Sequence, residues 1–205
     1  MTRVKICGIV RADDAFAAAE AGADALGFVL DDSPRRIGAD EVRAIVRRLP
    51  PFVRTVGVFR IAELAVVREL AARAEVDLVQ LHGEEPVVRG REIGRPLIQR
   101  FRVAADDTAE RLRARLAGCA GATALLDPGA GSGAPFRWDI ARGLPGPVIV
   151  AGGLDAQNVG RAIRAARPYA VDVSSGIEDA PGIKNVHKIR GFIAAVRSED
   201  ARSAA

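Results

Sequence analysis

The sequence predicts a single compact (β/α)8 TIM barrel of the α/β class, and three observations support this fold. Short runs rich in β-branched residues alternate with longer stretches of Ala, Arg, Glu and Leu at helical spacing. The 205 residues divide into eight such pairs of about 26 residues, close to the smallest unit of this barrel. The rival fold, an open doubly wound sheet, usually carries a Gly-rich dinucleotide fingerprint after its first strand, and Cys7-Gly8-Ile9 does not match it.

The chain begins with a strand-like run, and each later run is again followed by a helical stretch. Strands that alternate with helices imply right-handed crossovers and a parallel sheet. The expected strands are residues 3–7, 24–30, 54–59, 77–82, 97–103, 122–127, 148–151 and 170–174. The expected helices are residues 13–21, 40–49, 61–73, 86–93, 108–116, 137–143, 157–166 and 184–196.

The composition indicates one folded domain. A content of 49% hydrophobic and 27% charged residues excludes a disordered chain. No linker or low-complexity tract divides the sequence, so we expect a catalytic barrel domain over residues 1–197 and a frayed tail over residues 198–205. The longest apolar stretches fall far short of the ~20 residues of a spanning helix, and no secretory signal pattern is found at the start. We therefore expect no membrane partner and a cytoplasmic location.

Charge and cysteine content exclude further classes. Thirty basic residues against 26 acidic ones give a net charge of only +4, without a basic block, so we expect no nucleic acid partner. Two Cys and two His cannot form a typical structural zinc site. A Cys7–Cys119 disulfide fails on geometry, because the two residues lie at opposite ends of strands that span ~16 Å, whereas bridged Cα atoms lie within ~7 Å. Cys7 is expected to be a free thiol.

The ends of the last two strands indicate a phosphate site. The segments 151–154 (AGGL) and 173–176 (VSSG) combine small residues with free backbone N–H groups. The loops after strands seven and eight are also where such barrels commonly hold a phosphate. Either loop alone could be an ordinary tight turn, but together they favour phosphate binding. The predicted phosphate-binding residues are Gly152, Gly153, Ser175 and Gly176.

Alternation along two neighbouring strands predicts an interior ion pair below a thiol. Lys5 and Cys7 share the face opposite Val4 and Ile6, so they should face the barrel interior. In the last strand Asp172 should also face inward, and the closed barrel makes the first and last strands neighbours. Lys5 and Asp172 can therefore pair beneath Cys7, since either charge alone would be costly to bury.

Four further polar residues are expected at the active-site mouth. Asp127 ends an apolar strand and faces Cys7 across the barrel, which makes an acid/base pair possible, although a turn residue before Pro128 is the alternative. Arg36 is placed to hold a carboxylate with two hydrogen bonds, although many such loop arginines are simply solvated. Gln80 and His82 point inward at the mouth, where they are candidates for substrate binding.

As a set, these residues resemble the phosphoribosylanthranilate isomerases of tryptophan biosynthesis. The matching segments run in order from residue 4 to the last helix, and such coverage is highly specific. They are residues 4–9 (VKICGI), 22–29 (GADALGFV), 33–36 (SPRR), 56–59 (VGVF), 79–83 (VQLHG), 151–154 (AGGL), 158–159 (NV) and 171–178 (VDVSSGIE).

The resemblance implies an isomerase that converts N-(5-phospho-β-D-ribosyl)anthranilate to 1-(o-carboxyphenylamino)-1-deoxyribulose 5-phosphate by an Amadori rearrangement, without a cofactor or metal. It implies that Cys7 is the general base, that Asp127 is the general acid and that Arg36 holds the anthranilate carboxylate. The glycine and serine loops correspond to the family's phosphate site. The expected partner is thus a small phosphosugar, and the expected assembly is a monomer or homodimer.

The sequence departs from the family at two places and leaves rival functions open. The loop after Asp127, through residues 130–133 (AGSG), is shorter than usual, and Lys184-Asn185 replaces a Lys-Asp pair. The nearest rival is the related isomerase of histidine biosynthesis, which uses two aspartates, and a bifunctional enzyme is a further alternative. A catalytically silent phosphosugar-binding or scaffold protein is the rival from another class, against which Cys7 and Asp127 argue.

Overall fold

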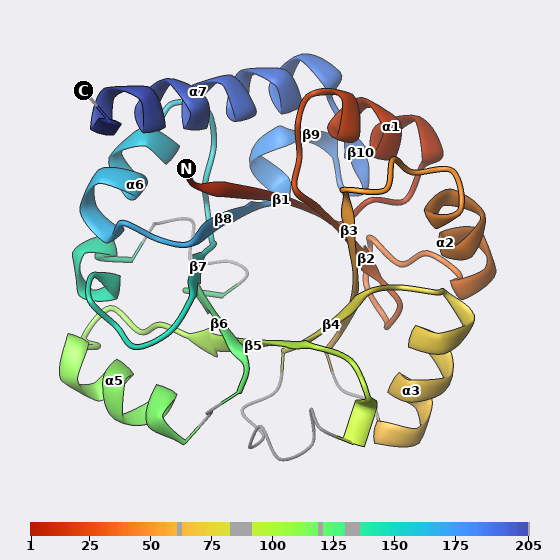
Figure 1. Ribbon diagram of the computed structural model, residues 1–205, viewed down its shortest axis with the longest axis horizontal. Coiled ribbons are helices and arrows are strands. Elements are labelled where there is room, and N and C mark those ends of the chain that lie inside the picture. The colour runs from red at the N-terminus through yellow and green to blue at the C-terminus, as the bar shows by residue number, and fades with distance from the viewer. Residues whose placement is uncertain (61–62, 83–91, 119–120, 130–135, 205) are drawn as a thin grey trace.

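The computed structural model describes residues 1–60, 63–82, 92–118, 121–129 and 136–204. Within them, eight parallel strands follow one another in chain order and close into a barrel, with β8 hydrogen-bonded to β1 (Figure 1). Helices surround the strands on the outside (Figure 1). The predicted (β/α)8 barrel is confirmed.

The strands lie within two residues of their predicted bounds. They are β1 (Arg3–Cys7), β2 (Ala25–Val29), β3 (Arg54–Phe59), β4 (Leu78–Leu81), β5 (Leu97–Arg102), β6 (Thr123–Asp127), β7 (Val148–Val150) and β8 (Ala170–Val173). Parallel register places Lys5 beside Ala25 on one side and beside Asp172 on the other. All carboxyl ends of the strands therefore meet at one end of the barrel.

The helices follow the predicted order, with two corrections. They are α1 (Ala12–Glu20), α2 (Ala39–Val46), α3 (Leu64–Arg73), α5 (Ala109–Ala117), α6 (Val159–Ala166) and α7 (Val186–Ala204). Most of the helix expected at 86–93 lies outside the described residues. In place of the helix expected at 137–143 there is a short 3-10 helix, η1 (Trp138–Ala141), whose Trp138 and Ile140 are buried.

The second correction concerns the C-terminal segment, where a frayed tail was expected. α7 instead continues through Ser198 to Ala204. Glu199 is buried and pairs with Arg164 of α6, and Asp200 accepts hydrogen bonds of 2.8 and 2.7 Å from the backbone N–H and the hydroxyl of Thr2. These polar anchors hold the last turns, although the apolar periodicity ends at Val196.

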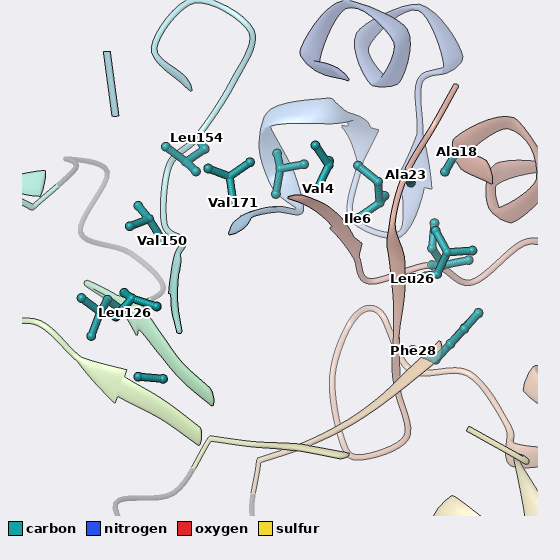
Figure 2. Packing of buried hydrophobic residues seen from close by; sticks show 14 of the residues in the cluster. Val4, Ile6, Ala18, Ala23, Leu26, Phe28, Leu126, Val150, Leu154 and Val171 are labelled. Carbon is teal, nitrogen blue, oxygen red and sulfur yellow. The ribbon is translucent and has the colours of Figure 1, made fainter. Parts of the chain in front are cut away.

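The two faces of the sheet carry separate apolar clusters. Val4, Ile6, Leu126 and Val171 belong to the larger cluster, which fills the space between strands and helices (Figure 2). A smaller cluster fills the barrel interior and consists of Cys7, Val29, Val56, Val58, Ile98, Leu125, Ile149, Ala151 and Ala170. Burying each large side chain stabilises the fold by roughly 1.5–3 kcal/mol. The predicted outward direction of Val4 and Ile6 is confirmed.

A small hairpin follows β8 and has no counterpart in the sequence-based prediction. After the 3-10 helix η2 (Ser175–Ile177), β9 (Glu178–Ala180) pairs antiparallel with β10 (Ile183–Lys184). The hairpin is joined to the first helix, because Asp14 accepts from the backbone N–H of Lys184 at 3.2 Å. Arg11 in turn binds Asp14 at 2.7 Å and the carbonyl of Lys184 at 3.3 Å.

None of the helices in the described part of the chain combines the length and apolar character needed to cross a bilayer.

Candidate active site

A cavity of about 1050 Å³ opens where the carboxyl ends of the strands meet. It is lined by residues from strand ends around the ring and from the loops that follow them. These include Cys7, Gly8, Asp31, Arg35, Arg60, Gln80, His82, Arg100, Asp127, Gly152, Gly153, Asp172, Ser174 and Ser175. A separate groove of about 620 Å³ between α3 and residues 93–95 contains none of these side chains. The cavity thus collects most of the predicted site residues.

Cys7 lies at the end of β1 above a buried ion pair. Lys5 Nζ lies 2.8 Å from Asp172 Oδ1, and both side chains are almost completely buried, as alternation predicted. Burial alone would lower the pKa of Lys5, but Asp172 and Cys7 together outweigh it and raise the pKa to about 12. Burial raises the pKa of the Cys7 thiol, and the positive charge of Lys5 opposes part of that rise. Cys7 is a free thiol, as expected, whereas Cys119 lies outside the described residues.

Gly27 on β2 allows the thiol and the ammonium to share this space. A Cβ at Gly27 would lie 2.9 Å from Cys7 Sγ and 3.1 Å from Lys5 Nζ. Both groups therefore converge on the same point of the β2 backbone, and any larger residue there would push them apart. Sequence reasoning did not single out Gly27, because a glycine inside a strand gives no sign of what approaches it.

Asp127 lies at the end of β6 with both carboxylate oxygens held. Arg100 Nε lies 3.1 Å from Oδ2, and the backbone N–H of Gly129 donates to Oδ1 at 3.0 Å. Arg100 comes from β5 and also lines the cavity. Arg100 was not predicted. Its position on the inward-facing side of β5, three residues after the strand begins, could have indicated it. These contacts fix the direction of the carboxyl group.

Gln80 and His82 form a hydrogen-bonded pair at the end of β4. Gln80 Nε2 and His82 Nε2 lie 2.9 Å apart, and both residues line the cavity. Burial, with smaller contributions from Arg100 and Lys5, lowers the pKa of His82 to about 4. His82 is therefore neutral at pH 7. The Gln80 Oε1 atom is buried and has no hydrogen-bond partner among the described residues.

The structure separates the arginine doublet at the rim. Arg36 is exposed, its backbone bridges to Val29, and it is not among the residues that line the cavity. The neighbouring Arg35 lines the cavity instead. Its side chain crosses Gly8, where a Cβ would meet Arg35 Cδ at 2.5 Å, and Gly8 adopts a φ of +75° that favours glycine. Arg35 therefore occupies the position that was predicted for Arg36.

The two predicted phosphate loops meet at the cavity, with one exception. Gly152, Gly153 and Ser175 line it, whereas Gly176 packs against Leu154, whose carbonyl oxygen would lie 2.0 Å from a Cβ at that position. Gly176 thus brings the loop after β8 into contact with the loop after β7. Within the described part of the chain, no hydrogen bond uses the backbone N–H groups of Gly152, Gly153, Ser175 or Gly176.

Most of the shortened loop after Asp127, including residues 130–133, lies outside the described residues. Lys184, at the other departure from the family, is buried at the base of the small hairpin, and Asn185 accepts bonds from the N–H groups of His187 and Lys188.

Among the described residues, no three His, Cys, Asp or Glu side chains come together as metal ligands would.

Comparisons with known proteins show the family of this chain. Residues 4–195 match the family model for N-(5'-phosphoribosyl)anthranilate (PRA) isomerase. An N-(5'-phosphoribosyl)anthranilate isomerase of Geobacter metallireducens is 48% identical over 201 residues, which cover 94% of this chain and 98% of that protein. One from Pseudomonas putida is 47% identical, over 95% of this chain and 97% of the relative.

Solved structures of the same family superpose along the whole barrel. The phosphoribosyl anthranilate isomerase of Thermotoga maritima matches with a TM-score of 0.87 and 38% identity, over 97% of this chain and 100% of that one. The Thermus thermophilus enzyme matches with a TM-score of 0.86 and 40% identity, over 96% and 99% of the two chains. A third structure (TM-score 0.85, 38% identity, 97% and 100% covered) is a complex with reduced 1-(o-carboxyphenylamino)-1-deoxyribulose 5-phosphate. With a family match along nearly its whole length and relatives close to half identical, this chain belongs to the N-(5'-phosphoribosyl)anthranilate isomerase family, the isomerase class that its sequence predicted.

Proposed function

We propose that this chain catalyses the Amadori rearrangement of N-(5-phospho-β-D-ribosyl)anthranilate to 1-(o-carboxyphenylamino)-1-deoxyribulose 5-phosphate, a step of tryptophan biosynthesis. One observation carries the proposal. A thiol at the end of β1 and a carboxyl group at the end of β6 line the same cavity as Gly152, Gly153 and Ser175 of the loops after β7 and β8, whose backbone N–H groups have no hydrogen-bond partner within the described ranges. A base, an acid and an anion site around one cavity are what an aldose–ketose isomerase of a phosphosugar requires.

The phosphate end of the substrate is bound by the two loops. Gly152, Gly153 and Ser175 line the cavity, and their backbone N–H groups have no hydrogen-bond partner among the described residues, so they can donate to phosphate oxygens. Gly176 does not line the cavity, and it supports the phosphate site by packing on Leu154, which brings the two loops together. The phosphate bound there would leave the ribose between the ends of β1 and β6.

The carboxylate end is bound by Arg35. Its side chain lines the cavity and crosses Gly8, which directly follows the residue that carries the thiol. A guanidinium can offer two parallel N–H donors to a carboxylate, and such charge-assisted bonds contribute about 1.5–3 kcal/mol. Gln80 and neutral His82 offer further hydrogen bonds to the sugar hydroxyls.

The two proton transfers follow from these positions. Asp127 gives a proton to the ribose ring oxygen, the bond between that oxygen and C1′ breaks, and a Schiff base with the anthranilate nitrogen forms. The Cys7 thiolate then removes the proton from C2′, and the electron pair moves to give an enolamine. Tautomerisation, which transfers a proton from the C2′ hydroxyl to C1′, completes the ketone. The thiolate is required, so the positive charges near Cys7, with Lys5 first among them, support the reaction.

The substrate carries a phosphate and a carboxylate and does not cross membranes unaided, so we infer that the enzyme acts in the cytoplasm, where such an intermediate is made. A solved Thermotoga maritima relative is described as dimeric, and for this chain we keep a monomer or homodimer. No cofactor or metal enters the proposed steps.

The proposal is tested by incubating the purified protein with phosphoribosylanthranilate and following the loss of its anthranilate fluorescence. Cys7→Ala and Asp127→Ala should each lower kcat by about 10²–10⁴-fold, as the loss of a general base or acid does. The matched control is Cys119→Ser, which removes the only other cysteine and should leave kcat unchanged. Wild-type protein without turnover, or Cys7→Ala with normal turnover, would contradict the proposal. Turnover of the histidine-pathway aminoimidazole substrate would contradict its restriction to one substrate.

A further inference from the structure

The hairpin β9–β10 places a buried carboxylate between two cations at the cavity rim. Glu178 accepts from Arg35 twice, with Nε at 2.9 Å and Nη2 at 2.6 Å. It also accepts from Lys184 Nζ at 2.7 Å. The side chains of Glu178 and Lys184 are 5% and 0% exposed, so these two groups are shielded from water. Burial opposes ionisation of Glu178, but Arg35 and Lys184 outweigh it and lower the pKa of its carboxyl.

Lys184 extends the cluster to the strand that carries the thiol. Besides Glu178, its ammonium donates to the carbonyl of Cys7 at 2.6 Å and to the carbonyl of Ser174 at 3.2 Å. Cys7 ends β1, and Ser174 precedes the loop that contains Ser175. One buried side chain therefore joins the end of the catalytic strand, the phosphate loop and the partner of Arg35.

The geometry of the Arg35–Glu178 pair has a direct consequence for binding. A free arginine at a cavity rim samples many rotamers, and ordering it on binding costs side-chain conformational entropy. The bidentate pair fixes the plane of the guanidinium before substrate arrives. It uses Nε and Nη2, so the Nη1 group and the second Nη2 hydrogen are left for another acceptor. Two cations against one anion also leave a net positive charge.

We propose that Glu178 is a positioning residue that holds Arg35 in the orientation needed to bind the substrate carboxylate. The inference rests on the proposed function for the identity of that carboxylate. Glu178 does not touch the reacting atoms, and it acts through Arg35. Removing it should therefore weaken substrate binding far more than it slows the chemical step.

The test compares KM and kcat of Glu178→Gln with those of the wild type, with phosphoribosylanthranilate as substrate. We expect KM to rise on the order of tenfold, with kcat changed less than about threefold, because the amide cannot hold two donors of Arg35. Asp179→Asn is the matched control. Asp179 follows Glu178 on β9, is exposed, and pairs with Lys188 and Asn185 away from the cavity. Its KM should stay at the wild-type value.

A double-mutant cycle separates positioning from a general structural effect. In an Arg35→Met background, Glu178→Gln should no longer change KM, because the side chain that it positions is gone. An equal rise in KM in both backgrounds, or no rise in either, would overturn the inference. If Glu178→Gln does not fold, Glu178→Asp takes its place in the same cycle, since its shorter carboxylate keeps the charge but loses the bidentate reach.

The two proposals can fail separately. Wild-type protein that binds but does not convert phosphoribosylanthranilate would contradict the proposed function. Calorimetric binding of reduced 1-(o-carboxyphenylamino)-1-deoxyribulose 5-phosphate would still test Glu178 in that case, and Glu178→Gln should weaken it on the order of tenfold. Inorganic phosphate should bind wild type and Glu178→Gln alike, since the loops that hold it are unchanged. Unaltered binding of the reduced compound by the variant would overturn the inference alone.

Discussion

Lys5 Nζ and Asp172 Oδ1 lie 2.8 Å apart beneath the Cys7 thiol, so the proposed base sits above a buried pair of opposite charges. The two charges act on the thiol in opposite directions: Lys5 lowers the pKa of Cys7 and Asp172 raises it, while burial makes the largest contribution and raises it. The ion pair thus adjusts, beside the larger effect of burial, how much thiolate is available at a given pH.

The first prediction follows from this pair. In a Cys119→Ser background, Lys5→Met should raise the pKa of Cys7 further, and a lost charge at this range typically shifts a pKa by about 1 unit or more. Alkylation of Cys7 by iodoacetamide at pH 8, followed by mass spectrometry, should slow by about tenfold. Asp172→Asn should lower the pKa of Cys7 and speed its alkylation. Identical alkylation rates for the Cys119→Ser parent and the two variants would show that the ion pair does not affect the thiol.

The second prediction compares the two adjacent arginines. Arg35→Met should raise KM for phosphoribosylanthranilate by about 10–100-fold, as expected for a lost charge-assisted hydrogen bond. Arg36→Met should change KM less than about twofold, because that side chain is exposed and does not line the cavity. Steady-state kinetics of both variants measure this directly. A larger effect at Arg36 than at Arg35 would refute the assignment.

The third prediction compares two glycines of one turn. A Cβ at Gly152 would lie 2.2 Å from Pro128 Cδ and 3.0 Å from Asp127 Oδ1, whereas a Cβ at Gly153 meets no atom of the described residues within 4 Å. Both have positive φ, so each Ala carries a backbone cost of about 1–3 kcal/mol. Only Gly152→Ala should also displace the acid, and its kcat should fall at least tenfold below that of Gly153→Ala. Equal kcat values in the two folded variants would be evidence against this coupling.

The fourth prediction concerns pH. The pKa of His82 is about 4 in the folded protein and near 6.5 when unfolded, so the unfolded chain binds the proton first as pH falls. The stability contributed by neutral His82 is complete above pH 6.5 and is lost as pH falls towards 4. Between pH 7 and 4.5 wild type should lose roughly 2–3 kcal/mol more than His82→Asn. Urea unfolding of both proteins at the two pH values measures this, and parallel losses would argue against a buried neutral histidine.

Period-two alternation was enough to predict the parts of the site that lie on strands. Lys5 and Cys7 had to face inward because Val4 and Ile6 needed the helix side, and parallel register then brought Asp172 beside Lys5. The end of β6 likewise placed Asp127 at the cavity. Strand positions are predictable because one residue of slip would exchange every inward and outward side chain.

Loop positions were less predictable for the same reason. In the Arg35-Arg36 doublet nothing in the residue types tells which side chain turns inward, and the choice depends on the Val29 bridge and on the open space over Gly8. The hairpin that holds Glu178 gave no recognisable signal, since it has only short strands. The end of α7 was missed because polar contacts from Glu199 and Asp200, not apolar periodicity, hold its last turns.

The closure of β8 onto β1 also has a consequence for folding during synthesis. Lys5 and Asp172 are separated by 167 positions in the chain, and Thr2 and Asp200 by 198. A nascent chain leaves the ribosome with β1 first, so Lys5 has no Asp172 carboxylate to pair with until β8 has been translated. Such late, distant contacts slow folding, since the entropy of closing the intervening chain must be lost before they form. The strand that bears the thiol is therefore among the first segments made and among the last to reach its final surroundings.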